Sequence, residues 1–405
     1  RSSSTVETMP DSMHFSTWEN NAWQLEEVAG LRYDTRGRMQ HMLMYDRPGA
    51  GSRQFGAVDY HYTPAGELGS YVFSTVFAGL RREEFRLEFQ YDAQGNKTSG
   101  SIRMPDSTGS MVTVFGDSLA YTYDQRNRIS SATLYVFDFI NFTGWIPLQQ
   151  ISHISWDGSN RPEAFESAYW DDDVQQWDNH RLFTHIKWGF GWNGFSRLFN
   201  TMHFELDFSL YEPVDFRFDE PSAYLSQYFD GSRWQDEELR DDELDGQGRV
   251  ITIRNFYHTG SQWASSNLMR FDYQPLGIGS ITTYLYDENS AQYVPFDRTT
   301  YRYHANGSMA TKEGEQHDGN RWQPLHAKTY SYSRNAAGQV SSQLVRELDL
   351  NTQLFNNYSL AAFFYRQPVA ASSRDQARSI PMEVYPNPTS GMVNIGIGED
   401  HTATE

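Results

Sequence analysis

The chain has 405 residues, of which 38% are hydrophobic and 15% aromatic, which is enough apolar material for a sizeable core. Lysine and arginine total 33 against 52 acidic residues, so the formal net charge is −19. Because phosphate contacts need clustered cations, we predict no nucleic-acid partner. Cysteine is absent, which excludes disulfides, thiolate metal sites and a cysteine nucleophile. No apolar run approaches the roughly 20 residues of a membrane helix, so we also predict no membrane span.

Residues 1–30 are interpreted as an N-terminal segment that holds the first strands. The sequence begins at Arg1, without a methionine or an apolar signal stretch. We therefore expect that it follows a signal peptide that has been removed, which favours a secreted protein.

One short element recurs through residues 31–365 and defines a repeat domain. It consists of an apolar, a polar and an aromatic residue, then often Asp, with Gly or Asn four residues after the aromatic. LRYDTRG at 31–37 and FQYDAQG at 89–95 are examples, and the steps between aromatic anchors average about 30 residues. The copies around Trp188 and Leu244 match least well. The anchors are Tyr33, Tyr62, Tyr91, Tyr123, Trp156, Trp188, Phe218, Leu244, Tyr273, Tyr303 and Tyr332.

Each copy of this element predicts a long β-hairpin. Alternating apolar and polar residues have the period of a strand with one buried face, and Asp followed by Gly suits a tight turn. About eleven hairpins would give roughly 22 antiparallel strands, which must stack because one hairpin cannot bury its aromatic face alone. The predicted fold class is all-β: an antiparallel meander that forms a curved sheet, a spiral shell or a propeller-like ring. Few helices are expected, and Arg233–Leu244 is the best helical candidate.

The Tyr-x-Tyr-Asp-x-x-Gly-Arg pattern, from about Leu31 to Val340, resembles the Rhs/YD-repeat class. It more closely resembles the tyrosine-rich hairpin repeats of large secreted Bacteroidota proteins, although its step is longer than that of the standard YD repeat. The resemblance implies a scaffold of hairpins at the cell surface or outside the cell. Three tripeptides, which begin at Asp11, Asp106 and Asp117, resemble the O-glycosylation acceptor motif of this phylum. The candidate acceptors are Ser12, Ser107 and Ser118.

Six of the eleven tryptophans lie between Trp145 and Trp192, which makes this the most unusual region of the repeat domain. Sugar rings stack on indole rings, so one hypothesis is a glycan-binding platform. The alternative is that these side chains fill the inner face where the repeats are longest. The candidate glycan-binding residues are Trp170, Trp177, Trp188 and Trp192.

The sequence contains no recognisable catalytic constellation. His180 and His185 flank a predicted strand, but exposed strand residues are a simpler interpretation than a metal pair. We therefore predict no catalytic residue, no metal and no cofactor. An outer-membrane barrel is rejected, because strands such as Ser308–Asp318 lack an apolar face for lipid.

Residues 366–381 are interpreted as a linker, and residues 382–405 as the start of a further domain. The segment VYPNPTSGMVNI at 384–395 resembles the beginning of the C-terminal sorting domain read by the type IX secretion system. That resemblance implies the type IX secretion machinery as a partner. The residues of the sorting motif are Tyr385, Pro386, Asn387, Pro388 and Gly391.

These patterns favour a secreted, non-enzymatic structural or adhesive protein of the cell surface. Because an open sheet leaves two unpaired edges, we expect it to assemble with copies of itself or with other surface proteins and glycans. The alternative is a carbohydrate-binding surface protein that uses the Trp145–Trp192 region, and a weaker alternative is a secreted hydrolase with acidic residues in a groove.

Overall fold

The computed structural model describes residues 9–46, 52–138, 144–190, 221–365, 382–386 and 393–397. These residues form strands and turns and contain no helix, so none of them belongs to a helix long enough to cross a membrane. The predicted helix at Arg233–Leu244 is wrong, because the segment Trp234–Leu244 is a strand hydrogen-bonded on both sides. Pairing with two neighbours has overridden a local composition that suits a helix.

Twenty-two strands make up the main sheet. The first eleven are β1 (Ser12–Glu19), β2 (Ala22–Tyr33), β3 (Met39–Tyr45), β4 (Gln54–Tyr62), β5 (Leu68–Phe77), β6 (Leu80–Tyr91), β7 (Lys97–Pro105), β8 (Met111–Tyr123), β9 (Ile129–Phe137), β10 (Trp145–Trp156) and β11 (Pro162–Asp171). The others are β12 (Gln176–Lys187), β13 (Ala223–Phe229), β14 (Trp234–Leu244), β15 (Val250–His258), β16 (Trp263–Gln274), β17 (Gly277–Asp287), β18 (Gln292–Tyr303), β19 (Met309–His317), β20 (Trp322–Arg334), β21 (Val340–Asp349) and β22 (Leu354–Phe364).

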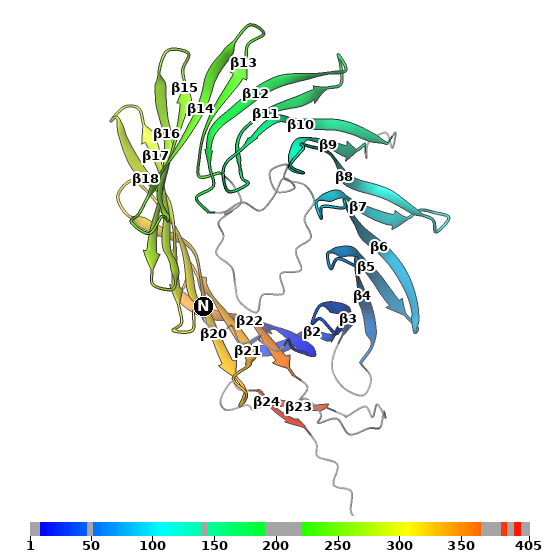
Figure 1. Ribbon diagram of the computed structural model, residues 1–405. Helices are drawn as coiled ribbons and strands as arrows, with labels where there is room; N and C mark the ends of the chain where they lie inside the picture. The colour runs from blue at the N-terminus through cyan, green and yellow to red at the C-terminus, as the bar shows by residue number, and fades with distance from the viewer. Residues whose placement is uncertain are drawn as a thin grey trace, which may run out of the picture.

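The sheet is a closed antiparallel barrel (Figure 1). Each strand pairs with the next along the chain, and β1 pairs with β22 from Ser12↔Phe364 to Thr17↔Ser359. The all-β antiparallel prediction is therefore confirmed, but the sheet closes into a barrel and not into an open curved sheet or a propeller. Closure also removes the unpaired edges on which the prediction of self-assembly depended.

The barrel repeats a unit of two strands, and its closure follows the same rule. Each even-numbered strand ends near an anchor, which is aromatic in every unit except that of β14, and the odd-numbered strand after it returns along the wall. Tyr365, directly after β22, is the anchor of the last unit, and its return strand is β1. The barrel therefore begins at β1, inside the segment 1–30 that we had separated from the repeat domain. Phe218, one of the predicted anchors, lies outside the described residues.

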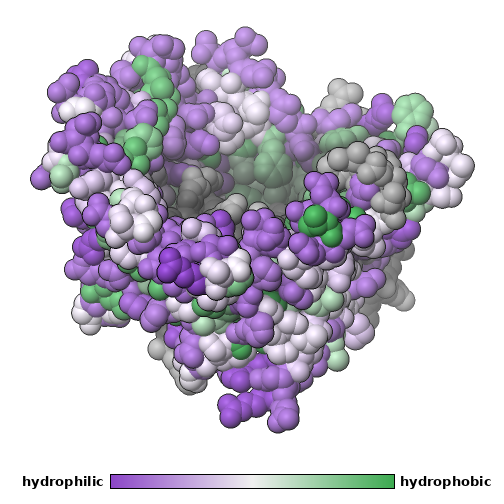
Figure 2. Space-filling model, turned by 90° about the horizontal axis from the view of Figure 1, so that it is seen from above, coloured by the Kyte–Doolittle hydropathy of each residue, from purple (hydrophilic) through white to green (hydrophobic). Residues whose placement is uncertain are grey.

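Twenty-two strands spaced ~4.8 Å apart need a circumference of at least ~105 Å, which means a radius of at least ~17 Å. The wall therefore encloses a wide lumen. Because the concave face brings side chains together, we assign the buried apolar residues to this lumenal face. They form three clusters along the wall, which contain Tyr60, Ile151 and Tyr301, respectively. Figure 2 shows a hollow with hydrophobic side chains inside a mostly hydrophilic rim.

The opposite, outer face carries charged cross-strand pairs. Arg298 contacts Glu315 on the neighbouring strand at 2.6 Å, and Arg103 contacts Glu88 at 3.3 Å. Asp59 pairs with both His41 and Arg81. Such pairs suit a solvated surface and contribute only small stabilisation individually.

The turns after the even-numbered strands gather at one end of the barrel, which we call the base. In the turn after β2, the carboxylate of Asp34 accepts hydrogen bonds from the backbone N–H groups of Arg36 and Arg38 at 2.8 and 2.9 Å. The Arg38 Nε also donates to this carboxylate, while its guanidinium lies 4.2 Å from the ring centre of Tyr62 in the next unit. Gly37 completes the turn with φ 78°, and Asn127 has φ 60° at the same position of another turn.

A second contact joins neighbouring units at the base, and we call it the anchor rung. The polar group of an anchor ring donates a hydrogen bond to a backbone carbonyl near the start of the preceding return strand; Tyr62 donates to Met39 at 2.9 Å. Each bond satisfies a main-chain acceptor close to the core. The same rung is made by Tyr33, Tyr91, Tyr121, Trp156, Trp188, Tyr273, Tyr303 and Tyr365.

Two of the predicted tyrosine anchors differ from this pattern. In β8 the rung comes from Tyr121, while the hydroxyl of Tyr123 bonds to Asp92 and accepts from Asn96. The Tyr332 hydroxyl accepts a hydrogen bond from Gln343 at 3.4 Å. The rings still pack against the core clusters at both positions.

The other end of the barrel, which we call the rim, holds the turns before the even-numbered strands. Here seven pairs of directly opposite aromatic or histidine residues meet in edge-to-face or tilted contacts, with ring centres 5.0–5.7 Å apart. These rim aromatic pairs are Trp18–Trp23, Phe137–Trp145, Trp170–Trp177, Phe229–Trp234, His258–Trp263, Tyr286–Tyr293 and His317–Trp322. They hold each hairpin together beyond the core.

A separate two-stranded sheet follows the barrel in the chain. It consists of β23 (Met382–Pro386) and β24 (Val393–Ile397), paired antiparallel. Tyr385 and Pro386 of the sorting motif belong to β23, whereas Asn387, Pro388 and Gly391 lie outside the described residues. The predicted linker 366–381 also lies outside them.

Candidate functional site

A pocket of about 350 Å³ lies in the wall where the repeat is least regular. Five consecutive strands, β12 to β16, contribute its lining. In this arc Leu244 occupies the anchor position of β14 and has no hydroxyl or indole N–H to make a rung. The pocket lies between this position and the rim. It is on the lumenal face, because its lining residue Phe183 packs beside Phe165 of a core cluster.

One side of the pocket is an ion pair between β12 and β14. Arg181 donates from Nη2 to the carboxylate of Glu237 at 2.8 Å. Glu237 stands at a register shift, because Ser226 pairs with Glu238 while Gln227 pairs with Asp236. The extra residue turns this strand locally, which places two consecutive glutamates beside the pocket.

The opposite side is made of amides. Asn255 of β15 donates from Nδ2 to Oδ1 of Asn267 on β16 at 2.7 Å, and a second register shift follows Asn255. Nearby, the Tyr257 hydroxyl donates to Glu288 at 3.0 Å. These contacts fix the orientation of the side chains before any ligand binds.

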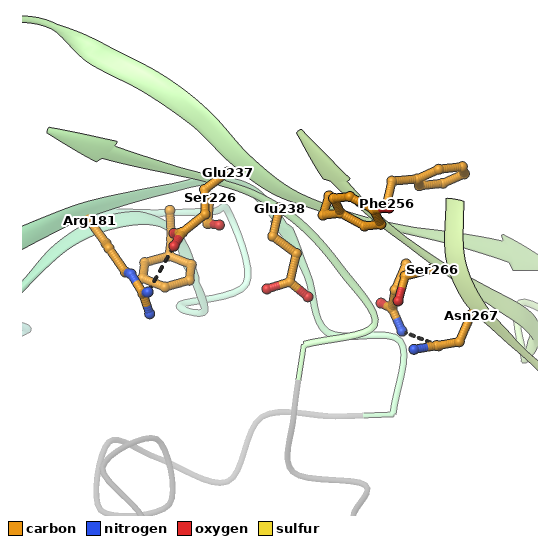
Figure 3. Close-up of a pocket in the computed structure, with 10 residues that line it drawn as sticks. Arg181, Ser226, Glu237, Glu238, Phe256, Ser266 and Asn267 are labelled. Carbon is orange, nitrogen blue, oxygen red and sulfur yellow. Dashed lines mark hydrogen bonds and ion pairs between the residues drawn. The ribbon is translucent and has the colours of Figure 1, made fainter. Parts of the chain in front are cut away.

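Glu238 projects between these two sides (Figure 3). Its carboxylate makes no hydrogen bond or ion pair with any of the described residues. Ser226 is 2% exposed, and neither its Oγ nor Oδ1 of Asn255 has a partner within the described part of the chain. Since buried polar atoms normally find partners, the pocket presents unused hydrogen-bond acceptors.

Three aromatic rings complete the lining: Phe183, Phe256 and Tyr257. Tyr257 is 41% exposed, so part of its ring is open to a ligand. Phe183 is supported from behind by Phe165, with ring centres 4.9 Å apart. The pocket thus combines apolar ring surfaces with a carboxylate and amide groups, the composition of a small-molecule site.

A buried polar network replaces the missing anchor rung next to the pocket. The side chain of Asp242 on β14 is 1% exposed and pairs with Lys187 at 2.9 Å. It also accepts a hydrogen bond from Ser222 at 2.6 Å, and Ser222 Oγ accepts one from the backbone N–H of Gly189. The hydrogen bond to Asp242 raises the pKa of Lys187. The network joins β12 and β14 through Ser222, directly before β13, without an aromatic anchor.

The structure does not bring the four candidate glycan-binding tryptophans together. Trp188 is 3% exposed, packs in a core cluster and donates its indole N–H to the Pro162 carbonyl, so it offers no surface for a sugar. Trp170 and Trp177 form one of the seven rim aromatic pairs. Trp192 lies outside the described residues.

The other predicted sites are scattered. Ser107 lies in an exposed turn, Ser12 begins β1 at the barrel seam, and Ser118 sits within β8, where its hydroxyl donates to Thr98 O at 3.3 Å. His180 bonds to Glu166 and His185 to Thr184, so these histidines are engaged separately. In the part of the chain that the structure describes, no three His, Asp or Glu side chains are placed to hold a metal ion.

Sequence reasoning missed the pocket, although it registered a signal. The copies around Trp188 and Leu244 match the repeat least well, and these are the units that line it. The helix interpretation of Arg233–Leu244 then hid Glu237 and Glu238, because only a strand alternates its side chains between lumen and solvent.

No known protein family and no curated protein matches this sequence. Among solved structures, a porin-like protein from Bacteroides uniformis is similar at 9% identity over 88% of this chain and 97% of that chain, with a TM-score of 0.24. A porin-like protein from Bacteroides vulgatus is similar at 10% identity over 66% of this chain and all of that chain (100%), with a TM-score of 0.27. The Tc holotoxin pore from Photorhabdus luminescens matches at 12% identity over 84% of this chain and 19% of that chain, with a TM-score of 0.23.

At such identities and TM-scores these likenesses establish neither family nor function. The resemblances to YD-repeat proteins and to the type IX sorting domain stay predictions.

Proposed function

We propose that this chain is a secreted, non-enzymatic surface protein whose barrel is a rigid scaffold for binding or adhesion at the rim. The observation that carries the proposal is the exposure of large apolar side chains at the rim hairpins. Phe77 and Leu80, on either side of one turn, are 71% and 77% exposed. Further exposed apolar residues beside rim turns are Val174, Phe229, Leu350 and Leu354. Large exposed apolar groups are costly in water and typical of interaction surfaces.

Other features support a place outside the cell. The charged pairs on the outer face are suited to water, and the β23 segment carries the beginning of the predicted type IX sorting motif. We therefore propose export by the type IX secretion machinery and a location at the cell surface or outside the cell. The partners proposed for the rim are surface proteins or glycans. Assembly through sheet edges is not proposed, because β1 and β22 pair with each other.

The test is retention of the purified barrel on surfaces coated with mucin, collagen or whole bacterial cells. A variant with Phe77→Ser, Leu80→Ser and Leu354→Ser removes apolar surface from two rim turns. The matched control is Leu244→Ser, which changes an exposed apolar residue at the base. We expect the rim variant to lose most of the retention and the control to keep it. A wild-type barrel that stays monomeric and is retained on none of these surfaces contradicts the proposal.

A further inference from the structure

We propose that the pocket between β12 and β16 is a binding site for an uncharged saccharide. This inference rests on the proposed binding function and names the chemical class of one ligand. The pocket volume of about 350 Å³ lies near the lower end of the range for small-molecule sites, about 300–1,000 Å³, which suits the end of a short saccharide.

The first argument comes from hydrogen-bond acceptors. The Glu238 carboxylate, Asn255 Oδ1 and Ser226 Oγ border the pocket without a protein partner among the described residues. A ligand that fits must therefore supply several donors. Saccharide hydroxyls do so, because each one donates a hydrogen bond and can still accept another.

The second argument comes from the rings. The C–H faces of a sugar are apolar and pack on aromatic side chains, for which Phe183, Phe256 and Tyr257 are available. Tyr257 is held by Glu288 and Phe183 by its tilted contact with Phe165, so little conformational freedom is lost on binding.

The third argument concerns charge. The guanidinium of Arg181 is already paired with Glu237, whereas Glu238 has no cationic partner in the described chain. An acidic sugar would bring a second negative charge next to Glu238, in a protein whose net charge is −19. The pocket therefore selects against uronic acids and sialic acid.

The experiment is saturation-transfer NMR on the purified full chain. The probes are the methyl glycosides of glucose, galactose, mannose and N-acetylglucosamine, with glucuronic acid as the charged comparison. The variants are Glu238→Gln, which keeps the shape of the side chain, and Tyr257→Ala, which removes one ring. Glu243→Gln is the matched control, because Glu243 lies on the same strand and pairs with Arg254 away from the pocket.

We expect saturation transfer to at least one neutral glycoside and none to glucuronic acid, unchanged in Glu243→Gln. Glu238→Gln should weaken binding about tenfold or more, as the loss of a hydrogen bond to a charged group predicts. Tyr257→Ala should weaken it by a similar factor, because it removes ring surface on which the sugar packs. Unchanged circular dichroism and melting temperature in the variants show that the barrel is intact.

The inference is overturned if the folded wild type gives no transfer to any neutral glycoside, or if both pocket variants bind as well as the wild type. It is also overturned if only a Trp170→Ala, Trp177→Ala variant loses binding, which would place the sugar at the rim pair. The surface-retention assay separates the two proposals. Retention without sugar binding removes the pocket inference alone, and loss of retention in the wild type removes the binding function.

Discussion

The units built on β16 and on β14 are joined to their neighbouring strands by different contacts. In the first, Tyr273 donates to Val250 O at 3.0 Å, and the Arg249 guanidinium lies 4.2 Å from its ring centre. In the second, Leu244 makes neither contact, and buried Asp242 joins the strands through Lys187 and Ser222 instead. The barrel wall thus tolerates the loss of one anchor rung where another polar contact bridges the same strands.

This difference shows where the barrel has room for function. The regular unit uses its lumenal positions for the core, as buried Phe271 of β16 illustrates. On β14, Asp242 holds the corresponding position, two residues before the anchor, and the pocket opens beside Glu238, further along the same face toward the rim. In a scaffold whose units repeat the same packing, a binding site is expected in the unit that departs from the repeat.

The largest effect expected from this comparison is on stability. Tyr301→Ala empties a position that is 1% exposed in the core of a regular unit, and should lower the free energy of unfolding by about 3–5 kcal/mol. Leu244→Ala, at an exposed position of the irregular unit, should cost less than about 1 kcal/mol. Urea unfolding followed by tryptophan fluorescence measures both. Equal losses in the two variants would show that the irregular unit is packed as tightly as the others.

Much of the barrel wall could be predicted from the sequence, because its determinants are local. The period of two along each strand, the Asp and Gly of the turns and the regular spacing predict antiparallel hairpins without knowledge of distant contacts. Closure could not be predicted in this way. It depends on the pairing of Ser12 with Phe364 at the two ends of the wall, and on Tyr365, which lies one step after the last anchor we assigned.

The pocket was harder to predict for a related reason. Its residues come from five strands spread over residues 181–267, and two register shifts decide which side chains face the lumen. A shift of one residue exchanges the faces of a strand, and the sequence does not mark where a bulge falls. The tryptophan cluster of the sequence is divided in the structure, with Trp188 in the core and Trp170 and Trp177 at the rim. Trp170 and Trp177 are close in sequence and space but serve as one rim pair among seven.

The anchor rung allows a more specific comparison of the regular and irregular units, with a smaller expected effect on the free energy of unfolding. Tyr273→Phe keeps the ring and leaves the Val250 carbonyl without its hydroxyl donor, so it should cost about 0.5–1.5 kcal/mol. Tyr358→Phe is the control, because this exposed tyrosine has no rung. Leu244→Tyr supplies the ring and hydroxyl that the irregular unit lacks, and should stabilise the barrel by up to about the same amount. A stabilising effect of Tyr273→Phe would contradict a role for the rung.

The smallest expected effect concerns the base turns, which the two kinds of unit share. Asp34 in a regular unit and Asp245 after β14 both accept hydrogen bonds from backbone N–H groups and from an arginine, and these lower the pKa of each carboxyl. Since the pKa is lower in the folded protein, this stabilisation is present above about pH 4, the ordinary value for Asp, and is lost as the pH falls through the folded-state pKa.

Asn335 shows that an amide oxygen can hold the same turn, because its Oδ1 accepts from the N–H groups of Ala337 and Gln339 at 3.0 Å. Asp34→Asn and Asp245→Asn should therefore fold normally but lose less thermal stability than the wild type between pH 7 and pH 3. Melting temperatures from circular dichroism across this range test the prediction. An equally reduced dependence of melting temperature on pH in the two variants means that the turn after β14 is stabilised in the same way as a regular turn, although the unit has no aromatic anchor. An effect confined to Asp34→Asn would mean that the irregular unit lacks both the anchor rung and the stabilising turn carboxylate.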